Sequence, residues 1–153
     1  MKIENLEIIE GKGAGELLFD RDIKTWIEVL NEKPHESEDD ESLDYCWPKL
    51  GVNYLNYFDG TKELTIFNDQ KKLFYKGINF FKDDNDEVHR KMCELDGSPM
   101  YKLGYTYLFN LGICLIDFYR YDGEQDNRVV SIFTPGVYDK KSKRMRYLEE
   151  SEW

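Results

Sequence analysis

Two segments of this sequence match each other about 65 residues apart, and this match limits the possible folds more than any other feature. The pattern L-x-x-x-P occurs at 30–34 and again at 95–99. A similar segment follows in each half, KLGVNYLNYFDG at 49–60 and NLGICLIDFYRYDG at 110–123, the second longer by two residues. Because the landmarks recur in the same order, the sequence indicates an internal duplication.

Each of these segments ends in an Asp-Gly pair, and a short apolar run follows, LTIF at 64–67 and VSIF at 130–133. Asp-Gly between alternating apolar segments is a strong signal for a β-hairpin. The chain therefore reads as two copies of helix, strand, strand, strand. The copies cover about 16–77 and 78–138.

The helix of each copy is predicted from apolar spacing. Asp20 is a suitable N-cap, and an apolar stripe at i, i+3, i+4 and i+7 follows it before Pro34 stops the helix. That stripe consists of Ile23, Trp26, Ile27 and Leu30. The second helix is expected over 84–95, with Val88, Met92 and Leu95 on its buried face.

The whole chain is predicted to be one α+β domain over 1–153, in which two tandem repeats form antiparallel sheet with the helices packed on one face. Residues 139–153 are expected as a charged C-terminal tail, 32–42 as an acidic loop, and Gly11 to Gly15 as a flexible turn rather than a phosphate loop. Strands are expected near 3–9, 44–48, 51–58, 63–68, 72–76, 104–109, 112–121 and 128–134.

This arrangement of helix, proline and three strands, present twice, resembles the tandem helix-plus-sheet modules of the β-lactamase inhibitory protein family. It is also similar to small outer-membrane assembly lipoproteins of the same fold. The resemblance covers nearly the whole chain as a pattern of elements. It implies a fold and a style of protein binding, and no particular target.

The charge of the chain bears on its partners. With 31 acidic against 21 basic residues, the net charge is −10, so nucleic acid and anionic membrane would repel the chain, whereas a basic protein would be attracted. The first residues lack the pattern of a signal peptide, and Cys46, Cys93 and Cys114 contain no CxxC pair. We therefore expect a cytoplasmic protein with free thiols.

Catalytic and metal chemistry find little support in the residue patterns. His89 and Cys93 lie four residues apart on the second helix, but no pattern of a thiol hydrolase surrounds them. The five Cys and His residues lack the spacings of a zinc site, and neither acidic cluster fits a calcium loop. We expect no cofactor, no metal and no catalytic residue.

Alternation along the central strands suggests a binding face. One set of alternate positions holds Leu55 and Tyr57, matched by Ile116 and Phe118, and is expected to face the core because it is uncharged. The other set is then the outer face, an aromatic surface suited to protein binding. Its members are Val52, Tyr54, Asn56, Phe58, Ile113, Asp117, Tyr119 and Tyr121.

The acidic run has no counterpart in the second copy, where 96–102 is short and nearly uncharged, so it is not needed to build the module. Beside an aromatic face it suits a basic partner, although a role in solubility alone stays open. Its carboxylates are Glu36, Glu38, Asp39, Asp40, Glu41 and Asp44.

The function hypothesis that follows is a non-catalytic binding protein, most concretely a bacterial immunity protein that covers the active or substrate-binding surface of a basic toxin. Two alternatives stay open. One is a small enzyme using a carboxylate or the His89–Cys93 pair between the two modules. The other is a homodimeric scaffold protein. The sequence is compatible with a monomer or a homodimer.

Overall fold

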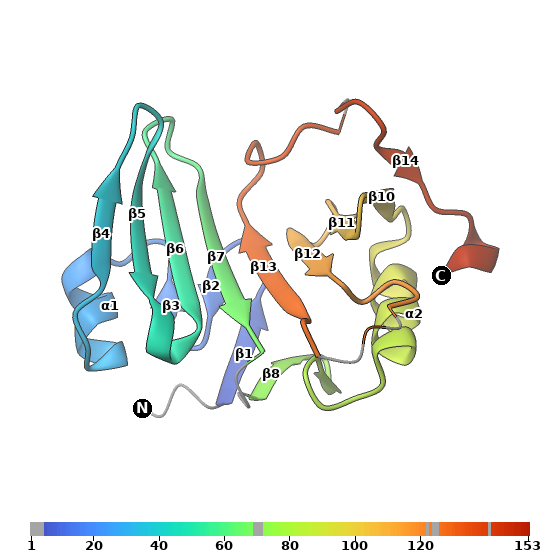
Figure 1. Ribbon diagram of the computed structural model, residues 1–153, viewed down its shortest axis with the longest axis horizontal. Coiled ribbons are helices and arrows are strands. Elements are labelled where there is room, and N and C mark those ends of the chain that lie inside the picture. The colour runs from blue at the N-terminus through green and yellow to red at the C-terminus, as the bar shows by residue number, and fades with distance from the viewer. Residues whose placement is uncertain (1–4, 69–71, 122, 124–125, 141) are drawn as a thin grey trace.

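The structure is a computed structural model that describes residues 5–68, 72–121, 123, 126–140 and 142–153. Within these residues the chain forms two α-helices and two sheets whose strands are mostly antiparallel, which confirms the predicted α+β class (Figure 1). The helices are α1 (Ile23–Leu30) and α2 (Asn85–Asp96). Neither is long and apolar enough to cross a membrane.

The larger sheet has nine antiparallel strands, and the pair β7–β13 joins the strands of its two halves. At this joint, Phe67 of β7 lies opposite Val129 of β13, and Leu64 lies opposite Ile132. The segments that follow α1 and α2 thus meet in the middle of one sheet. In order across the sheet, the strands are β14 (Arg146–Tyr147), β10 (Met100–Lys102), β11 (Tyr105–Leu108), β12 (Ile113–Ile116), β13 (Val129–Phe133), β7 (Lys62–Phe67), β6 (Val52–Tyr57), β5 (Ser42–Trp47) and β4 (His35–Glu38).

The smaller sheet has five strands, and one of its pairs, β1 with β8, is parallel. Its apolar side chains, among them Leu6, Leu17 and Leu73, join the same core as the larger sheet. Gly13 lies where an added Cβ would come within 2.0 Å of the Leu17 oxygen, so the segment predicted as a flexible turn includes a tightly paired strand. The order is β3 (Leu17–Leu18), β2 (Gly13–Ala14), β1 (Asn5–Ile9), β8 (Lys72–Tyr75) and β9 (Ile78–Asn79).

Helix α1 begins two residues later than the predicted cap. Asp22, rather than Asp20, accepts a hydrogen bond from the Thr25 backbone N–H at 3.0 Å. Trp26 is fully buried, and its ring stacks on Tyr54 of β6 with 4.1 Å between centroids. This stack packs the helix onto the sheet.

Helix α2 is capped by Asp84, whose side chain accepts from the Glu87 N–H, and ends at Gly97 with φ of 84°. Val88 and Met92 are buried as predicted, but Leu95 is 41% exposed. The buried face of the helix turns instead toward Cys93 and Asp96. The Asp96 side chain accepts hydrogen bonds from the backbone N–H groups of Asn110 and Leu111, which satisfy this carboxylate although it is buried.

The predicted assignment of the two faces is wrong for β6 and β12, although Phe118, which follows β12, is buried in the main core as predicted. Tyr54 is only 2% exposed, and Val52 and Ile113 are buried with it in the main core, whereas Leu55, Tyr57 and Ile116 are half-buried on the opposite face. Asn56 and Asp117, the polar residues that predicted the outer face, lie at strand ends, where a polar side chain does not indicate which face is exposed. Asn56 is near the end of β6, and Asp117 follows the last residue of β12 with a left-handed φ of 62°.

Two other segments differ from expectation. The acidic loop predicted over 32–42 contains strand β4, which pairs with β5 along its full length. The C-terminal residues expected as a charged tail include β14, the 3₁₀-helix η2 (Glu150–Glu152) and a buried Leu148. Tyr147 pairs opposite Met100 at the edge of the large sheet.

Candidate protein-binding site

The acidic run forms the turn and outer strand of the β4–β5 hairpin. The Asp39 Oδ1 atom accepts hydrogen bonds from the Glu41 and Ser42 backbone N–H groups, both at 2.8 Å. These two backbone donors lower the pKa of Asp39. Asp39 therefore shapes the turn, and Asp40 and Glu41 are left exposed to solvent at its tip.

The neighbouring hairpin, β6–β7, brings Phe58 beside this tip. The Phe58 backbone N–H donates to the Glu41 carbonyl at 2.8 Å, and the Phe58 side chain is 56% exposed. Asp59 holds the β6–β7 turn by accepting from the Thr61 N–H at 2.9 Å. Two turns built on aspartates thus lie side by side and expose an aromatic ring between carboxylates.

These two turns and the segment after β13 surround a hollow of about 400 Å³ where the strands end, which we call the acidic hollow. Three of its lining residues are carboxylates, and no lining residue is basic. Carboxylates beside exposed aromatic rings suit a lysine or arginine side chain, which gains both an ion pair and a cation–π contact. The lining residues are Asp40, Glu41, Tyr57, Phe58, Asp59, Thr61, Gly136 and Val137.

The electrostatics of Tyr57 report a negative potential in this hollow. Burial raises the pKa of its hydroxyl to about 12, and repulsion by nearby carboxylates adds to the shift. Burial, the larger cause, disfavours any charged group here, whereas the smaller contribution from the carboxylates disfavours an anion and favours a cation. The contributing carboxylates, in decreasing order, are Glu63, Glu41, Asp39 and Asp44.

Two of those carboxylates lie on the half-buried face of the sheet, in one cross-strand row with Leu55. Glu63 is buried and accepts from Ser131 Oγ at 2.9 Å and from the Tyr138 hydroxyl, and burial raises its pKa. The pKa of Asp44 is also raised, by burial and then by Asp39, and its Oδ1 atom has no hydrogen-bond partner in the described part of the chain. Burial thus favours the neutral forms of both carboxylic acids, which act on the neighbouring Tyr57 hydroxyl.

The structure divides the predicted site residues into groups. Asp40, Glu41 and Phe58 meet at the acidic hollow, while Glu36 and Glu38 are exposed along β4. Sequence reasoning missed Tyr57, Glu63 and the segment at Gly136, because the wrong face assignment put Tyr57 in the core. Only the Asp-Gly signal for the hairpin turn could have pointed to this end of β6.

The remaining predicted residues are not part of this site. Tyr54 lies in the core beneath Trp26, and burial raises its pKa to about 12. Asn56 and Asp117 are half-buried. Tyr121 accepts from Asn127 Nδ2 at 2.9 Å, in a loop that follows β12.

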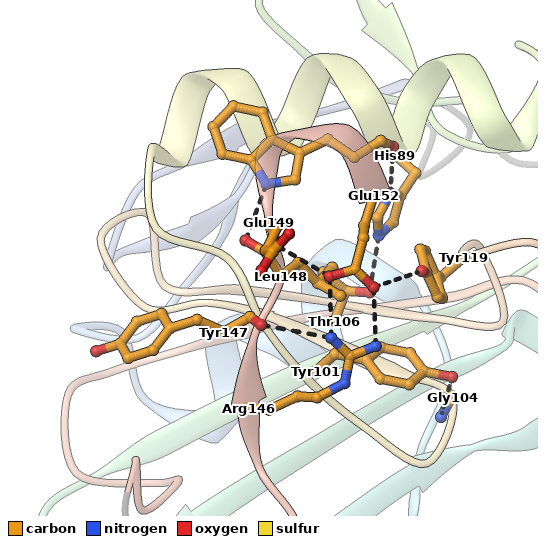
Figure 2. Close-up of polar contacts among 11 residues, drawn as sticks. His89, Tyr101, Gly104, Thr106, Tyr119, Arg146, Tyr147, Leu148, Glu149 and Glu152 are labelled. Atoms are coloured by element: carbon orange, nitrogen blue, oxygen red, sulfur yellow. Dashed lines mark hydrogen bonds and ion pairs between the residues drawn. The ribbon is translucent and has the colours of Figure 1, made fainter.

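Tyr119 belongs instead to a set of contacts that anchors the C-terminal segment (Figure 2). Its hydroxyl donates to Glu152 at 3.3 Å, and Arg146 pairs with the same carboxylate at 3.0 Å. The Arg146 guanidinium lowers the pKa of Glu152 to about 2. The expectation that Tyr119 faces solvent as a binding anchor is therefore not met, since its ring lies against His89 and Tyr101.

His89 and Cys93 do touch, but they lie in the core. His89 is buried with both ring nitrogens engaged, Nδ1 with the Trp153 carbonyl and Nε2 with Thr106 Oγ1, each at 2.9 Å (Figure 2). The Cys93 Sγ atom is 3.7 Å from His89 Nδ1, and burial raises the pKa of the Cys93 thiol to about 12. A thiol this hard to ionise, out of contact with solvent, is a poor nucleophile.

Among the described residues, no group of three or more His, Cys, Asp or Glu side chains is placed to hold a metal ion. A scan of protein-family models, a search of curated proteins and a search of solved structures found nothing that matches this chain.

Proposed function

We propose that this chain is a non-catalytic binding protein whose acidic hollow and β4–β5 hairpin engage a basic protein partner. The observation that carries the proposal is the convergence of Asp40, Glu41 and Asp59 around Tyr57 and Phe58, without a basic side chain in the lining. Such a surface speeds encounter through charge, and its rings supply anchors that can be buried in the complex.

The most concrete form of this function is a bacterial immunity protein, acting in the cytoplasm on a cognate toxin. Its charge of −10 complements the basic surface that a nuclease toxin needs for nucleic acid. By occupying that surface the chain would exclude the substrate, and no chemical step on the part of the chain is required. This form of the proposal rests on charge and on analogy with small acidic inhibitors.

The proposal also includes a two-repeat architecture with both helices on one sheet face. It is supported by the strand order, which runs β13, β12, β11 on one side of the β7–β13 joint and β7, β6, β5 on the other. The contacts of α1 with Tyr54 and of α2 with Thr106 also support it. Superposition of the two halves is the test, and halves with unrelated backbone paths would contradict the duplication.

The functional test is a charge reversal that leaves the turn intact. Glu36, Glu38, Asp40 and Glu41 are changed to Lys together, while Asp39 is kept because it accepts the turn hydrogen bonds. A control variant carries the same charge change at the exposed residues Glu7, Glu16, Asp20 and Glu28. Both are used to purify binding partners from the source cells.

We expect the wild-type protein and the control to retain a basic partner that the reversal variant loses. The on-rate of the wild-type complex should fall steeply with added salt, since the steering charges are exposed. Coexpression of the chain should then restore growth of cells that make this partner. Equal retention by both variants, or a salt-insensitive on-rate, would reduce the acidic run to a solubility device.

A further inference from the structure

Strand β4 is a free edge of the nine-stranded sheet. All four of its residues are exposed, and among the described residues only β5 pairs with it. Figure 1 shows β4 as the last strand at the left of the sheet. A free edge presents backbone donors and acceptors that another extended segment can pair with.

Two observed hydrogen bonds identify which backbone groups are free. The Asp39 N–H donates to the Ser42 carbonyl at 3.1 Å, which makes residues 37 and 35 the next ones along β4 that bond to β5. The Phe58 N–H donates to the Glu41 carbonyl at 2.8 Å, so residues 43 and 45 of β5 bond to β6. Residues 44 and 46 are then the ones that bond to β4, which agrees with the first hydrogen bond. The backbone N–H and C=O groups of Glu36 and Glu38 therefore point away from the sheet.

The side chains of these same two residues select what can pair there. Glu36 and Glu38 lie on one face of the strand, opposite Tyr45 and Leu43 of β5. A residue that pairs with either of them from a new strand would place its Cβ about 5 Å away, within reach of an ion pair for Lys or Arg. A second copy of this chain would bring carboxylates against carboxylates, which opposes pairing of two β4 edges.

We propose that the edge of β4 binds an extended basic segment of the partner by strand addition, with Lys or Arg at two alternate positions opposite Glu36 and Glu38. The inference rests on the proposed function and makes it more specific, since the acidic turn attracts the partner and the β4 backbone fixes its register. The other face of β4, with His35 and Ser37, carries no carboxylate, so the intervening residues of the partner need no charge.

The test uses a probe peptide of about ten residues in which lysine and threonine alternate. Two variants of the protein isolate the backbone contribution: Glu38→Pro removes both the charge and the outward N–H, whereas Glu38→Gln removes only the charge. Proline is tolerated at an edge position whose N–H faces solvent, so the β4–β5 pairing is expected to persist. The melting temperature of each variant checks this.

We expect Glu38→Pro to bind the peptide about tenfold more weakly than Glu38→Gln, because a backbone hydrogen bond is lost and the proline ring obstructs the edge. Peptide binding should also slow amide hydrogen exchange at Glu36 and Glu38, and leave Ser37, already bonded to β5, unchanged. If Glu38→Pro proves unfolded, the wild-type protein is tested with peptides N-methylated at alternate backbone positions, of which only one set should lose affinity.

Equal affinity of the proline and glutamine variants, equal affinity of both N-methylated peptides, or no binding at millimolar peptide would overturn strand addition. The proposed function has its own separate readout in the charge-reversal experiment on the native partner. If that experiment succeeds and the peptide experiments fail, the partner is bound by the acidic hollow without using the β4 edge. If the charge reversal itself has no effect, the proposed function fails first.

Discussion

At the scale of single residues, Tyr54 and Phe58 have different roles, although the sequence alone predicts the same role for both. Both were expected on an aromatic outer face, but Tyr54 stacks between Trp26 and Tyr45 while Phe58 stands at a hairpin tip. The alternation of the strand is the same for either choice of face. What decides the choice is the position of Trp26 on a helix distant in sequence, and no local pattern contains that information.

The two aromatic residues therefore give opposed results on truncation. We expect Tyr54→Ala to lower the free energy of unfolding by about 3–5 kcal/mol, since it leaves a cavity beneath Trp26. Phe58→Ala should change it by less than about 0.5 kcal/mol, because the ring is largely in water. Urea unfolding of both variants measures this, and a stable Tyr54→Ala variant would contradict the packing described.

His89 gives a pH dependence whose sign follows from its burial. Burial lowers its pKa below the ordinary value of 6.5, so the unfolded chain takes up a proton at a higher pH than the folded one. Stability from this group is complete above pH 6.5 and is lost as the pH falls toward the lowered pKa. His35, the other histidine, is exposed on β4.

The corresponding experiment compares wild-type protein with His89→Gln between pH 5 and 7.5. The variant keeps a side chain able to hydrogen-bond with Thr106 or Trp153 but does not titrate. We expect the stability advantage of the wild type to shrink as the pH falls across this range. An advantage that stays constant would mean that His89 carries no pKa shift relevant to folding.

At the scale of elements, most helices and strands were predictable and their edges were not. The two helices and the strands β5, β6, β7, β8, β11, β12 and β13 lie within a few residues of their expected positions. Strand β4 was missed because its sequence, HESE, has no apolar alternation to detect. An edge strand can form through backbone pairing alone when a well-formed neighbour, here β5, offers its free groups.

The formation of β4 should then depend on the turn that closes its hairpin. Asp39→Ala removes the acceptor for the Glu41 and Ser42 N–H groups, whereas Asp40→Ala removes a neighbouring charge that makes no such bond. We expect faster amide exchange along His35–Glu38 in the first variant and no change in the second. Equal exchange in both would mean that the strand persists without its turn.

At the scale of the whole molecule, one main core unites both halves and both sheets, and a smaller cluster of Met100, Tyr107, Cys114 and Phe133 lies apart from it. The buried cluster includes Trp26 in α1, Met92 in α2, Leu6 in β1 and Ile132 in β13. The sequence predicts a single domain, but it could not show that β7 pairs with β13 or that β1 and β8 are parallel. Such pairings join residues far apart in sequence and have no local signature.

A single core predicts a single unfolding transition. Tyr54→Ala weakens the half that contains α1, and Met92→Ala weakens the half that contains α2, so each should shift the whole transition by several degrees. Tryptophan fluorescence, dominated by the buried Trp26 and Trp47, and far-ultraviolet circular dichroism should give coincident curves for both variants. Separate midpoints would show that the halves unfold independently.

The β7–β13 joint has a consequence for the order of events during synthesis. Phe67 leaves the ribosome about 60 residues before its partner Val129, a delay of roughly 3–12 seconds at ordinary elongation rates. Throughout that interval β7 is the exposed edge of the sheet formed by β4, β5, β6 and β7. The backbone groups of Leu64 and Ile66 that later pair with β13 have no partner. The nascent chain is most prone to aggregation in this interval, and the emergence of β13 ends it by covering that edge.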